Sequence, residues 1–360
     1  MAMRIAILGG GHGAYAAAAD LSEKGHEIRL WRRDATAFAP VLKERVIALR
    51  DVAGIRSIPI ATATTDIGVA VRGAQLILIP SPAVAQSDIA TAIAPHLEHD
   101  QVVFLPPGTF GSYVMDRIAR QAGARAQVTY AETGTLPYLA RKRATGEVAI
   151  TIRAKRLPTG AYPAKRTAHA REVIARAYPA IEPCEDVLSA ALLNAGPIIH
   201  PPLILLNAAP LQHFQQWDIH HEGTQPAVRA VTGALDAERI AVREALGYRP
   251  PHFPLSDHYN NDRWMYGDAH KKLVDSGDWR EHIDLHHHRY MTEDVVLGLA
   301  FLDSVAQWAA CEAPVARGLL AVAGAILGRN LSHGPRTLAA LSLNARTPDQ
   351  LKELLREGET

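Results

Sequence analysis

The first half of the chain alternates short apolar runs with stretches of helical spacing. RIAILGG (4–10) has the length of a strand, and GAYAAAADLSEKG (13–25) reads as an alanine-rich helix that ends at a glycine. Apolar strands that alternate with helices are typical of a parallel, doubly wound sheet. We therefore expect an N-terminal Rossmann-type α/β domain over residues 1–185. Its expected strands are 4–10, 26–34, 74–82, 101–108, 127–134 and 147–156.

The pattern changes after about Cys184. EDVLSAALLNAGPIIHPPLILLNAA (185–209) reads as helix interrupted by its prolines, and amphipathic or apolar helices follow in 225–247, 292–311 and 313–328. We expect residues 186–360 to form an all-helical C-terminal domain. The stretch 248–288 is polar, aromatic and irregular, and its length favours a functional role over a passive loop.

Composition narrows the possible partners. The 360 residues are 48% hydrophobic, and 38 Lys plus Arg balance 37 Asp plus Glu, so neither nucleic acid nor an anionic membrane is expected as a partner. The two cysteines have no CxxC spacing, which argues against a zinc module or a disulfide framework. No signal peptide precedes the first strand, and the apolar stretches are short for a bilayer. We expect a cytoplasmic protein with small-molecule substrates.

A glycine-rich turn follows the first strand. GGGHGA has the form Gly-x-Gly-x-x-Ala, directly after a strand and before a helix. Such glycines permit a tight turn and a close backbone approach to a pyrophosphate at the helix N-terminus. The alternative is a tight turn that binds nothing, but strand, helix and second strand are all in place. We expect a dinucleotide at Gly9, Gly11, His12, Gly13 and Ala14.

The end of the second strand selects the cofactor. An NAD site usually has an acidic residue there, whereas LWRRD has Arg32 and Arg33, with Asp34 slightly later. Arginine matches a phosphate dianion, so NADP(H) is favoured and NAD(H) remains possible, with Asp34 on the ribose as the alternative. Pro80 and Ser81, and the segment PPGTFGS (106–112), follow later strands where this fold holds the nicotinamide and the substrate.

Three C-terminal and central segments carry a resemblance to a known family. AETGTLPYLAR (131–141), NAGPIIHPPLILLNA (194–208) and HRYMTEDVVLGL (288–299) stand in the order and spacing of motifs in the octopine/nopaline (opine) dehydrogenases. The chain resembles this family over nearly its whole length. The resemblance implies reductive condensation of an α-keto acid with an amino acid or amine, using NAD(P)H.

The resemblance also implies roles for individual residues. His200 matches the catalytic histidine, Asp294 its paired aspartate, and Arg289 the arginine that binds the substrate carboxylate. Tyr138 and Asn194 are expected to contact substrate.

The chemistry of these side chains agrees with such roles. Reduction of a C=N or C=O bond needs a proton donor, and histidine is suited to this near neutral pH. A carboxylate on the second ring nitrogen would fix the tautomer, and Asp294 is expected in the first turn of a helix with Thr292 as its cap. The alternatives are a buried structural His200, an Asp294 that only complements the helix dipole, and an Arg289 on the surface or paired with Glu293.

Three adjacent histidines raise the question of a metal site. His286, His287 and His288 cannot present three ligands to one metal from a strand or a helix, where i and i+4 spacing would be expected. The segment DIHHEG (218–223) could supply a second cluster of histidines, but only its composition suggests this. We expect no functional metal and assign HHHRYMTEDV (286–295) the task of placing Arg289 at a carboxylate and Asp294 at the ring of His200.

Two other functions remain open. A glycerol-3-phosphate or ketopantoate-type reductase shares the domain plan, but such enzymes usually need a central lysine, and lysines are sparse in the matching helices. A catalytically silent NADP-binding sensor, or a metal-binding protein that uses the histidines, is the alternative from another class. NADPH oxidation that depends on both a keto acid and an amine would exclude the sensor. We expect a homodimer formed through the helical domain.

Overall fold

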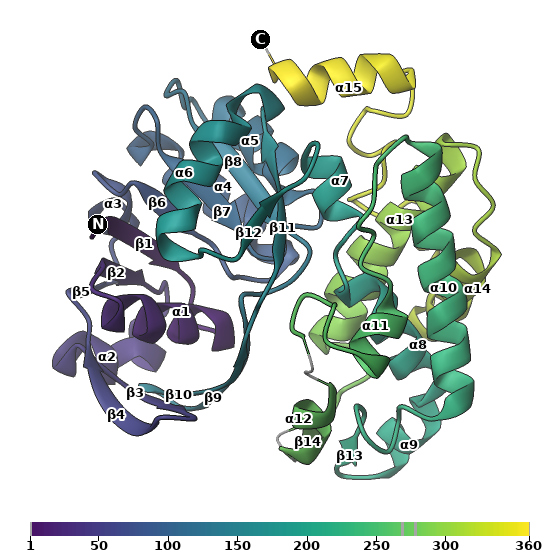
Figure 1. The fold of residues 1–360 in the computed structure, drawn as a ribbon, viewed down its shortest axis with the longest axis horizontal. Coiled ribbons are helices and arrows are strands. Elements are labelled where there is room, and N and C mark those ends of the chain that lie inside the picture. Colours follow the sequence, from purple (N-terminus) through teal and green to yellow (C-terminus); the bar gives the residue numbers. More distant parts are fainter. Residues whose placement is uncertain (1, 268–269, 277–278, 360) are drawn as a thin grey trace. The chain divides into compact units, whose positions relative to one another are not determined.

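The computed structural model describes residues 2–267, 270–276 and 279–359. The chain forms two compact units (Figure 1). Unit 1 comprises Met1–Ala191 together with the C-terminal residues Leu355–Thr360, and unit 2 comprises Leu192–Leu354.

An eight-stranded sheet forms the centre of unit 1. Its strand order is β12-β11-β8-β7-β6-β1-β2-β5, and neighbouring strands run parallel except for the antiparallel pair β11–β8. The strands are β1 (Arg4–Leu8), β2 (Glu27–Trp31), β5 (Thr62–Thr64), β6 (Leu76–Leu78), β7 (Val102–Leu105), β8 (Thr129–Thr133), β11 (Leu157–Tyr162) and β12 (Ile181–Pro183). The expected Rossmann-type sheet is confirmed.

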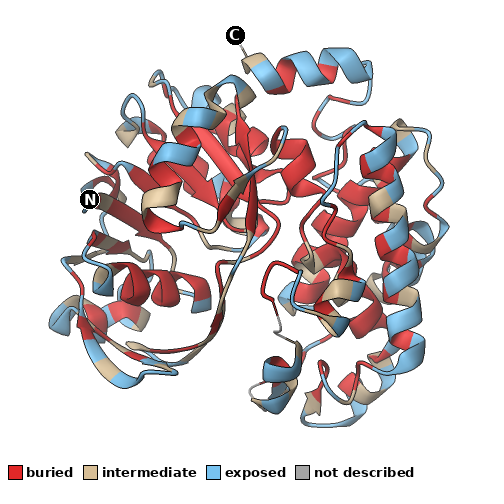
Figure 2. Cartoon of the chain, viewed as in Figure 1, coloured by how far each residue is buried: buried red, intermediate tan, exposed pale blue. Residues whose placement is uncertain are grey.

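Helices cover both faces of this sheet because its strands are apolar on both sides. In β1, Ile5 and Ile7 join one buried cluster with residues of α1 and α6, while Ala6 and Leu8 join a second cluster with residues of α3, α4 and α5. Figure 2 shows the inner strands of this sheet and most of α1 buried. The helices are α1 (His12–Glu23), α2 (Ala39–Glu44), α3 (Ile67–Val71), α4 (Gln86–Ile93), α5 (Gly111–Gln121), α6 (Thr167–Ala177) and α7 (Val187–Ala191), with short 3₁₀ turns at Thr36–Phe38, Ala83–Ala85, Ala94–His96 and Ala164–Arg166.

A second sheet of four strands was not expected. Its order is β4 (Gly54–Pro59), β3 (Val46–Asp51), β10 (Glu147–Arg153) and β9 (Tyr138–Ala144). The assignment of 147–156 to the parallel sheet is therefore wrong. Only Thr145 and Gly146, with φ +84° at the glycine, separate β9 from β10, and so short a loop joins antiparallel strands.

Unit 2 is built from helices around a buried pair. The first member is α8 (Gly196–Leu206), and the second is a π-helix, η5 (Tyr290–Leu299), that continues into α13 (Ala300–Trp308). The other elements are α9 (Ala208–His213), α10 (Pro226–Ala245), α11 (Leu255–Asn260), α12 (His270–Asp275) and α14 (Pro314–Leu327), with a two-residue pairing of β13 (Trp217–Asp218) and β14 (Arg280–Glu281). Helix α15 (Pro348–Glu357) ends in the residues that belong to unit 1.

The expected interruption of the helix at the prolines needs correction. The break falls between α7 and α8, and α8 continues through Pro201 and Pro202. Both prolines are buried, so packing of the apolar helix outweighs the hydrogen bonds that they cannot donate. The segment Val187–Leu206 has the length and hydropathy of a membrane span, but 83% of it is buried inside the protein, as in the core helix of a soluble domain.

Candidate active site

The turn after β1 needs residues without bulky side chains. Gly9 has φ +146°, and a Cβ atom there would lie 2.7 Å from the Ser81 hydroxyl oxygen. A Cβ at Gly13 would lie 2.8 Å from a methyl carbon of Leu136 and 3.1 Å from Cβ of Pro80. Helix α1 starts directly after Gly11. Because glycine has no side chain, no side-chain cap occupies the first backbone N–H groups of the helix. This cradle fits the pyrophosphate of a dinucleotide.

The residues at the end of β2 differ in exposure. The Arg32 guanidinium donates to the Ala37 carbonyl at 2.9 Å and covers Gly10, where an added Cβ would lie 2.5 Å from its Cδ atom. Arg33 is 80% exposed and forms a long, 3.5 Å ion pair with Asp88. The Asp34 carboxylate accepts from the backbone N–H of Ala37. Asp34 is therefore engaged in a local turn, and of the two arginines Arg32 is the one that lies against the glycine turn.

The segment after β7 is held by a buried carboxylate. Glu132 at the end of β8 is fully buried and accepts from the backbone N–H groups of Phe110 and Ser112 at 2.7 and 2.8 Å. Thr109 and Phe110 both have positive φ, a conformation that L-residues seldom adopt. Glu132 thus stabilises a strained loop at the carboxyl end of the sheet, where this fold keeps its substrate.

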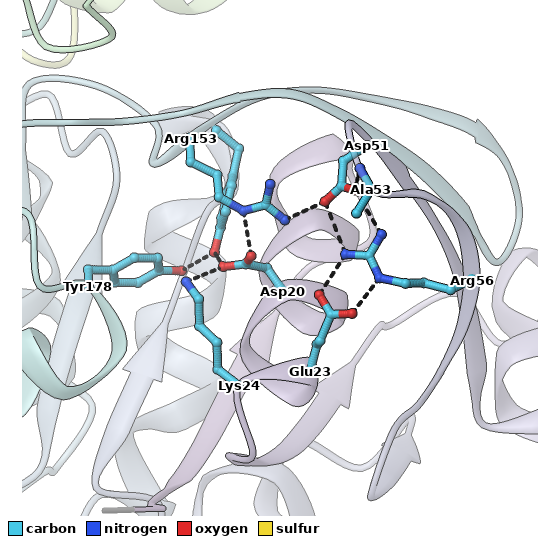
Figure 3. Close-up of polar contacts among 9 residues, drawn as sticks. Asp20, Glu23, Lys24, Asp51, Ala53, Arg56, Arg153 and Tyr178 are labelled. Atoms are coloured by element: carbon cyan, nitrogen blue, oxygen red, sulfur yellow. Dashed lines mark hydrogen bonds and ion pairs between the residues drawn. The ribbon is translucent and has the colours of Figure 1, made fainter.

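Tyr138, an expected substrate contact, is buried inside unit 1. It is 2% exposed, and its hydroxyl donates to the Asp20 carboxylate at 2.9 Å inside unit 1. Asp20 also accepts from Lys24 and Arg153, in the ion network drawn in Figure 3. Tyr138 therefore packs between β9 and α1, and its expected contact with substrate stays a prediction.

In unit 2, the structure brings His200 and Asp294 together. His200 Nδ1 lies 2.6 Å from a carboxylate oxygen of Asp294, across 94 positions of sequence. The Asp294 side chain is 6% exposed and the His200 side chain 13%. With Nδ1 bonded to a carboxylate, the second ring nitrogen, Nε2, is left as the position that can exchange a proton.

Two glycines allow the helices that carry this pair to approach closely. A Cβ at Gly196 in α8 would clash with the Asp294 carboxylate, with its carboxyl carbon 3.1 Å away. A Cβ at Gly298 in η5 would clash with the ring of Pro197, with Cβ of that ring at 2.9 Å. The small residues of the two sequence motifs therefore set the distance between the helices. The i→i+5 geometry of η5, which recurs at functional sites, extends over this contact.

Burial and a nearby cation tune the pair. Burial raises the pKa of the Asp294 carboxyl to about 7, against the lowering effect of Arg289 and His288. Burial, and then the charge of Arg289, hold the pKa of His200 well below its ordinary value. The two groups therefore take up a proton near neutral pH as one unit. Below that pH the pair holds the proton, and above that pH the pair has lost the proton and can act as a base.

Aromatic side chains fix the plane of the His200 ring. Tyr290 stacks on it with ring centroids 3.7 Å apart and an interplanar angle of 19°. The Tyr290 hydroxyl lies 3.3 Å from Nε2 of His220, which is buried and packs edge-on against Trp279 at 5.0 Å. Tyr290 and His220 were not among the expected site residues. Tyr290 lies inside the motif HRYMTEDV, and its place between Arg289 and Asp294 could have indicated that it belongs to the site. His220 lies in DIHHEG, where the sequence offered no indication beyond its composition.

Arg289 and Asn194 lie near the pair. Arg289 is exposed, and its guanidinium carbon is 5.0 Å from the centroid of the Tyr290 ring, so it can reach a carboxylate. Asn194 is buried, and its side-chain oxygen accepts from the N–H of Gly196 at the start of α8. The expected cap by Thr292 is wrong: its hydroxyl donates back to the His288 carbonyl inside the turn, and no side chain caps η5.

The histidines of the run 286–288 have separate surroundings. His287 lies 2.8 Å from the Asp284 carboxylate on the surface, and His288 packs edge-on against Tyr290 at 4.4 Å. Burial, followed by the charge of Arg289, lowers the pKa of His288 to about 4. Among residues 2–267, 270–276 and 279–359, no three His, Cys, Asp or Glu side chains are grouped to hold a metal ion.

Comparison with known proteins connects each unit with dehydrogenases. Residues 183–327 match the family model for the α-helical domain of NAD/NADP octopine/nopaline dehydrogenase, and residues 4–108 match the N-terminus of NAD-dependent glycerol-3-phosphate dehydrogenase. An opine dehydrogenase from Arthrobacter sp. (strain 1C) is 28% identical, with 95% of this chain and 96% of that protein covered.

Solved structures share the fold over the whole chain. Octopine dehydrogenase in complex with NADH and agmatine superposes with a TM-score of 0.70 at 16% identity, covering 96% of this chain and 99% of that one. Yersinopine dehydrogenase bound to NADP⁺ gives a TM-score of 0.66 at 18% identity, covering 99% and 98%. Glycerol-3-phosphate dehydrogenases from Azotobacter vinelandii and Pseudomonas fluorescens are 29% and 33% identical, with 34% and 33% of this chain covered.

Proposed function

We propose that this chain, whose helical domain belongs to the octopine/nopaline dehydrogenase family, is an NAD(P)H-dependent opine dehydrogenase. Its reaction is the reductive condensation of an α-keto acid with the amino group of an amino acid or amine. The observation that carries the proposal is the 2.6 Å contact of His200 Nδ1 with Asp294, beside Arg289, inside the domain that matches this family.

The residues of unit 1 suit a dinucleotide. We assign cofactor binding to residues 1–185, with the pyrophosphate at Gly9–Ala14 and the nicotinamide near Pro80 and Ser81. The side-chain-free turn supports this assignment, because added Cβ atoms would fill it. We further propose a preference for NADP(H), supported by Arg32 over Gly10 and by the engagement of Asp34 with Ala37.

In the proposed reaction, His200 manages the proton and Arg289 holds the keto acid. Nε2 of His200 takes a proton from the ammonium group of the amine, which frees its lone pair to attack the keto carbon. The same nitrogen returns the proton to the hydroxyl group, which leaves as water. The reduced nicotinamide supplies the hydride that converts the resulting C=N bond to an amine. Asp294 keeps the ring oriented and stabilises its charged form.

Arg289 has two tasks in this scheme. Its planar guanidinium can grip the keto-acid carboxylate through two hydrogen bonds. Its charge also holds the pKa of His200 low, which keeps the ring available as a base toward the ammonium group. Stacking on Tyr290 keeps the ring in one plane while the proton moves. Asn194 remains a proposed substrate contact, and its side-chain oxygen also accepts from the N–H of Gly196 at the start of α8.

The direct test is turnover with pairs of substrates. Purified protein is mixed with NADPH, one keto acid and one amine, and NADPH absorbance is followed while mass spectrometry looks for keto acid plus amine minus water plus two hydrogens. Oxidation should require both partners. Oxidation with a keto acid alone would instead indicate a ketopantoate-type reductase, and binding of NADPH without any turnover would indicate a sensor.

A matched pair of variants links turnover to the site. His200→Ala should abolish product, whereas His213→Ala, at an exposed histidine of α9 in the same unit, should retain it. Arg32→Ala combined with Arg33→Ala should raise the Michaelis constant for NADPH and spare NADH. Equal losses with both cofactors would refute the NADP(H) preference.

The same proposal includes a homodimer formed through residues 186–360 in the cytoplasm. Leu206 and Val322, on helices of unit 2, expose about half of their side chains and would suit a subunit contact. Among the described residues, Cys184 and Cys311 form no disulfide, as is usual in a reducing compartment. Light scattering of the purified protein measures the assembly, and a monomeric mass at assay concentration would contradict the dimer.

A further inference from the structure

One face of β9 runs along helix α1 in unit 1. Alternate side chains of a strand point the same way, and here Tyr138, Ala140 and Lys142 share that face. Tyr138 contacts Asp20 in the C-terminal half of α1, and Ala140 joins the buried cluster that contains α1. Lys142 comes next and lies at the N-terminus of α1, where its backbone N–H donates to Nδ1 of His12 at 2.7 Å.

The side chain of Lys142 extends over the glycine turn. Its Nζ atom lies 3.5 Å from the Gly10 carbonyl oxygen and 5.1 Å from the centroid of the Tyr15 ring. Arg32 covers the same glycine from β2. Arg32 and Lys142, which are 110 positions apart in sequence (142 minus 32), therefore converge on Gly10.

These two cations are not neutralised within the protein. In the part of the chain that the structure describes, Arg32 and Lys142 have backbone carbonyl partners, and neither forms an ion pair with a carboxylate. Burial, followed by the charge of Arg32, lowers the pKa of Lys142. Like charges held together at a half-buried position favour the binding of an anion there.

We propose that Lys142 and Arg32 together bind the adenosine 2′-phosphate of NADP(H), with β9 supplying a specificity residue. The inference rests on the proposed use of NADP(H). In this fold the ribose lies at the end of the second strand, beside Arg32, whereas the pyrophosphate faces the N–H groups that follow Gly11. Lys142 lies against Gly10, the glycine that Arg32 also covers, so it belongs to the ribose side. A phosphate dianion there would meet a guanidinium fork and an ammonium group.

Arg33 has a smaller part in this arrangement. Its side chain is mostly exposed, and its carboxylate partner, Asp88, is also exposed. The two arginines after β2 therefore have different roles. Arg32 binds the 2′-phosphate together with Lys142, and Arg33 lies outside this phosphate site. The sequence alone could not separate the two arginines.

The test is binding of cofactor to the intact chain, followed by protein fluorescence. Lys142→Met should weaken NADPH by at least about tenfold, the cost of one charge-assisted hydrogen bond, and leave NADH within about twofold. Lys142→Arg should recover most of the NADPH affinity. Arg143→Gln, at the neighbouring exposed position on the other face of β9, is the matched control and should change neither affinity.

A fragment probe separates this inference from the proposed reaction. Adenosine 2′,5′-bisphosphate carries the 2′-phosphate, whereas ADP lacks it, and neither requires a functional catalytic site. Lys142→Met should weaken the bisphosphate and spare ADP. Equal weakening of both, equal weakening of NADPH and NADH, or no change in a folded variant with an unaltered melting temperature would each overturn the proposal. Selective binding of the bisphosphate over ADP, without any opine formation, would refute the proposed reaction but would still support the role of Lys142.

Discussion

A methyl group added at Gly298 tests whether the close contact of two helices sets the catalytic geometry. The Cβ atom of Gly298→Ala would lie 2.9 Å from Cβ of Pro197, and closer to Cγ of the same rigid ring. Carbon atoms in contact lie roughly 3.5–4.0 Å apart, so η5 and α8 must separate by about 1 Å. Because His200 is on α8 and Asp294 is on η5, their hydrogen bond would lengthen with that separation.

The expected losses follow from that displacement. Overpacking of this kind costs roughly 1–3 kcal/mol of stability. A misplacement of about 1 Å at catalytic groups can reduce turnover roughly 100-fold. NADPH affinity should stay unchanged, because the cofactor residues belong to unit 1. We expect Gly298→Ala to lower both kcat and the melting temperature.

A second glycine provides the control. Gly233 lies inside α10, and a Cβ there would meet nothing within 4 Å. Gly233→Ala should keep normal kcat and gain up to about 1 kcal/mol, since alanine favours the helix. Steady-state kinetics and thermal melts of both variants make the comparison. Normal turnover in a Gly298→Ala protein that is as stable as the wild type would refute the reasoning.

Four further outcomes are expected. Asp294→Asn and His200→Ala should each lose roughly 10²–10⁴-fold in kcat, and the double variant little more, because the pair acts as a unit; additive losses would contradict this pairing. The condensation rate, kcat/KM, should fall as the pH drops below about 7, where the pair takes up a proton and stops acting as a base; a flat pH profile between 5 and 8 (about two units below and one above that value) would exclude it. Arg289→Lys should act mainly on the Michaelis constant for the keto acid, since a point charge replaces a fork, and a loss confined to the amine would reassign it. Asp51 in Figure 3 accepts from Arg56 and Arg153, which hold the pKa of its carboxyl below the ordinary value. The charged carboxylate therefore stabilises the fold above pH about 4, and this contribution disappears as the pH falls through the folded-state pKa. Asp51→Asn should lower the melting temperature at pH 7, whereas in acid the variant and the wild type should melt at the same temperature.

The Rossmann-type sheet and the helical domain could be predicted because their signals are local. The apolar run of β1, the glycine turn and α1 lie within about 20 consecutive positions, and backbone sterics and side-chain period decide such a unit. The antiparallel hairpin of β9 and β10 was missed, although Gly146 marks its turn. A single apolar run does not say which strand it will pair with, so its sheet is decided by partners elsewhere in the chain.

The candidate site divides in the same way. His200, Asp294 and Arg289 could be nominated from their motifs, but their contact depends on how α8 packs against η5. That packing rests on the space left by Gly196 and Gly298, which no local pattern reports.

The amino-acid sequence by itself therefore determined most of the elements, the glycine turn and the candidates for the acid/base residues. The tertiary structure decided the partners: Tyr290 stacks on His200, Tyr138 donates to Asp20, and Lys142 and Arg32 meet at Gly10. The physical reason is range. Turns and helices are stabilised between neighbours in sequence, whereas these contacts join positions far apart, and their geometry follows only from close packing of whole elements.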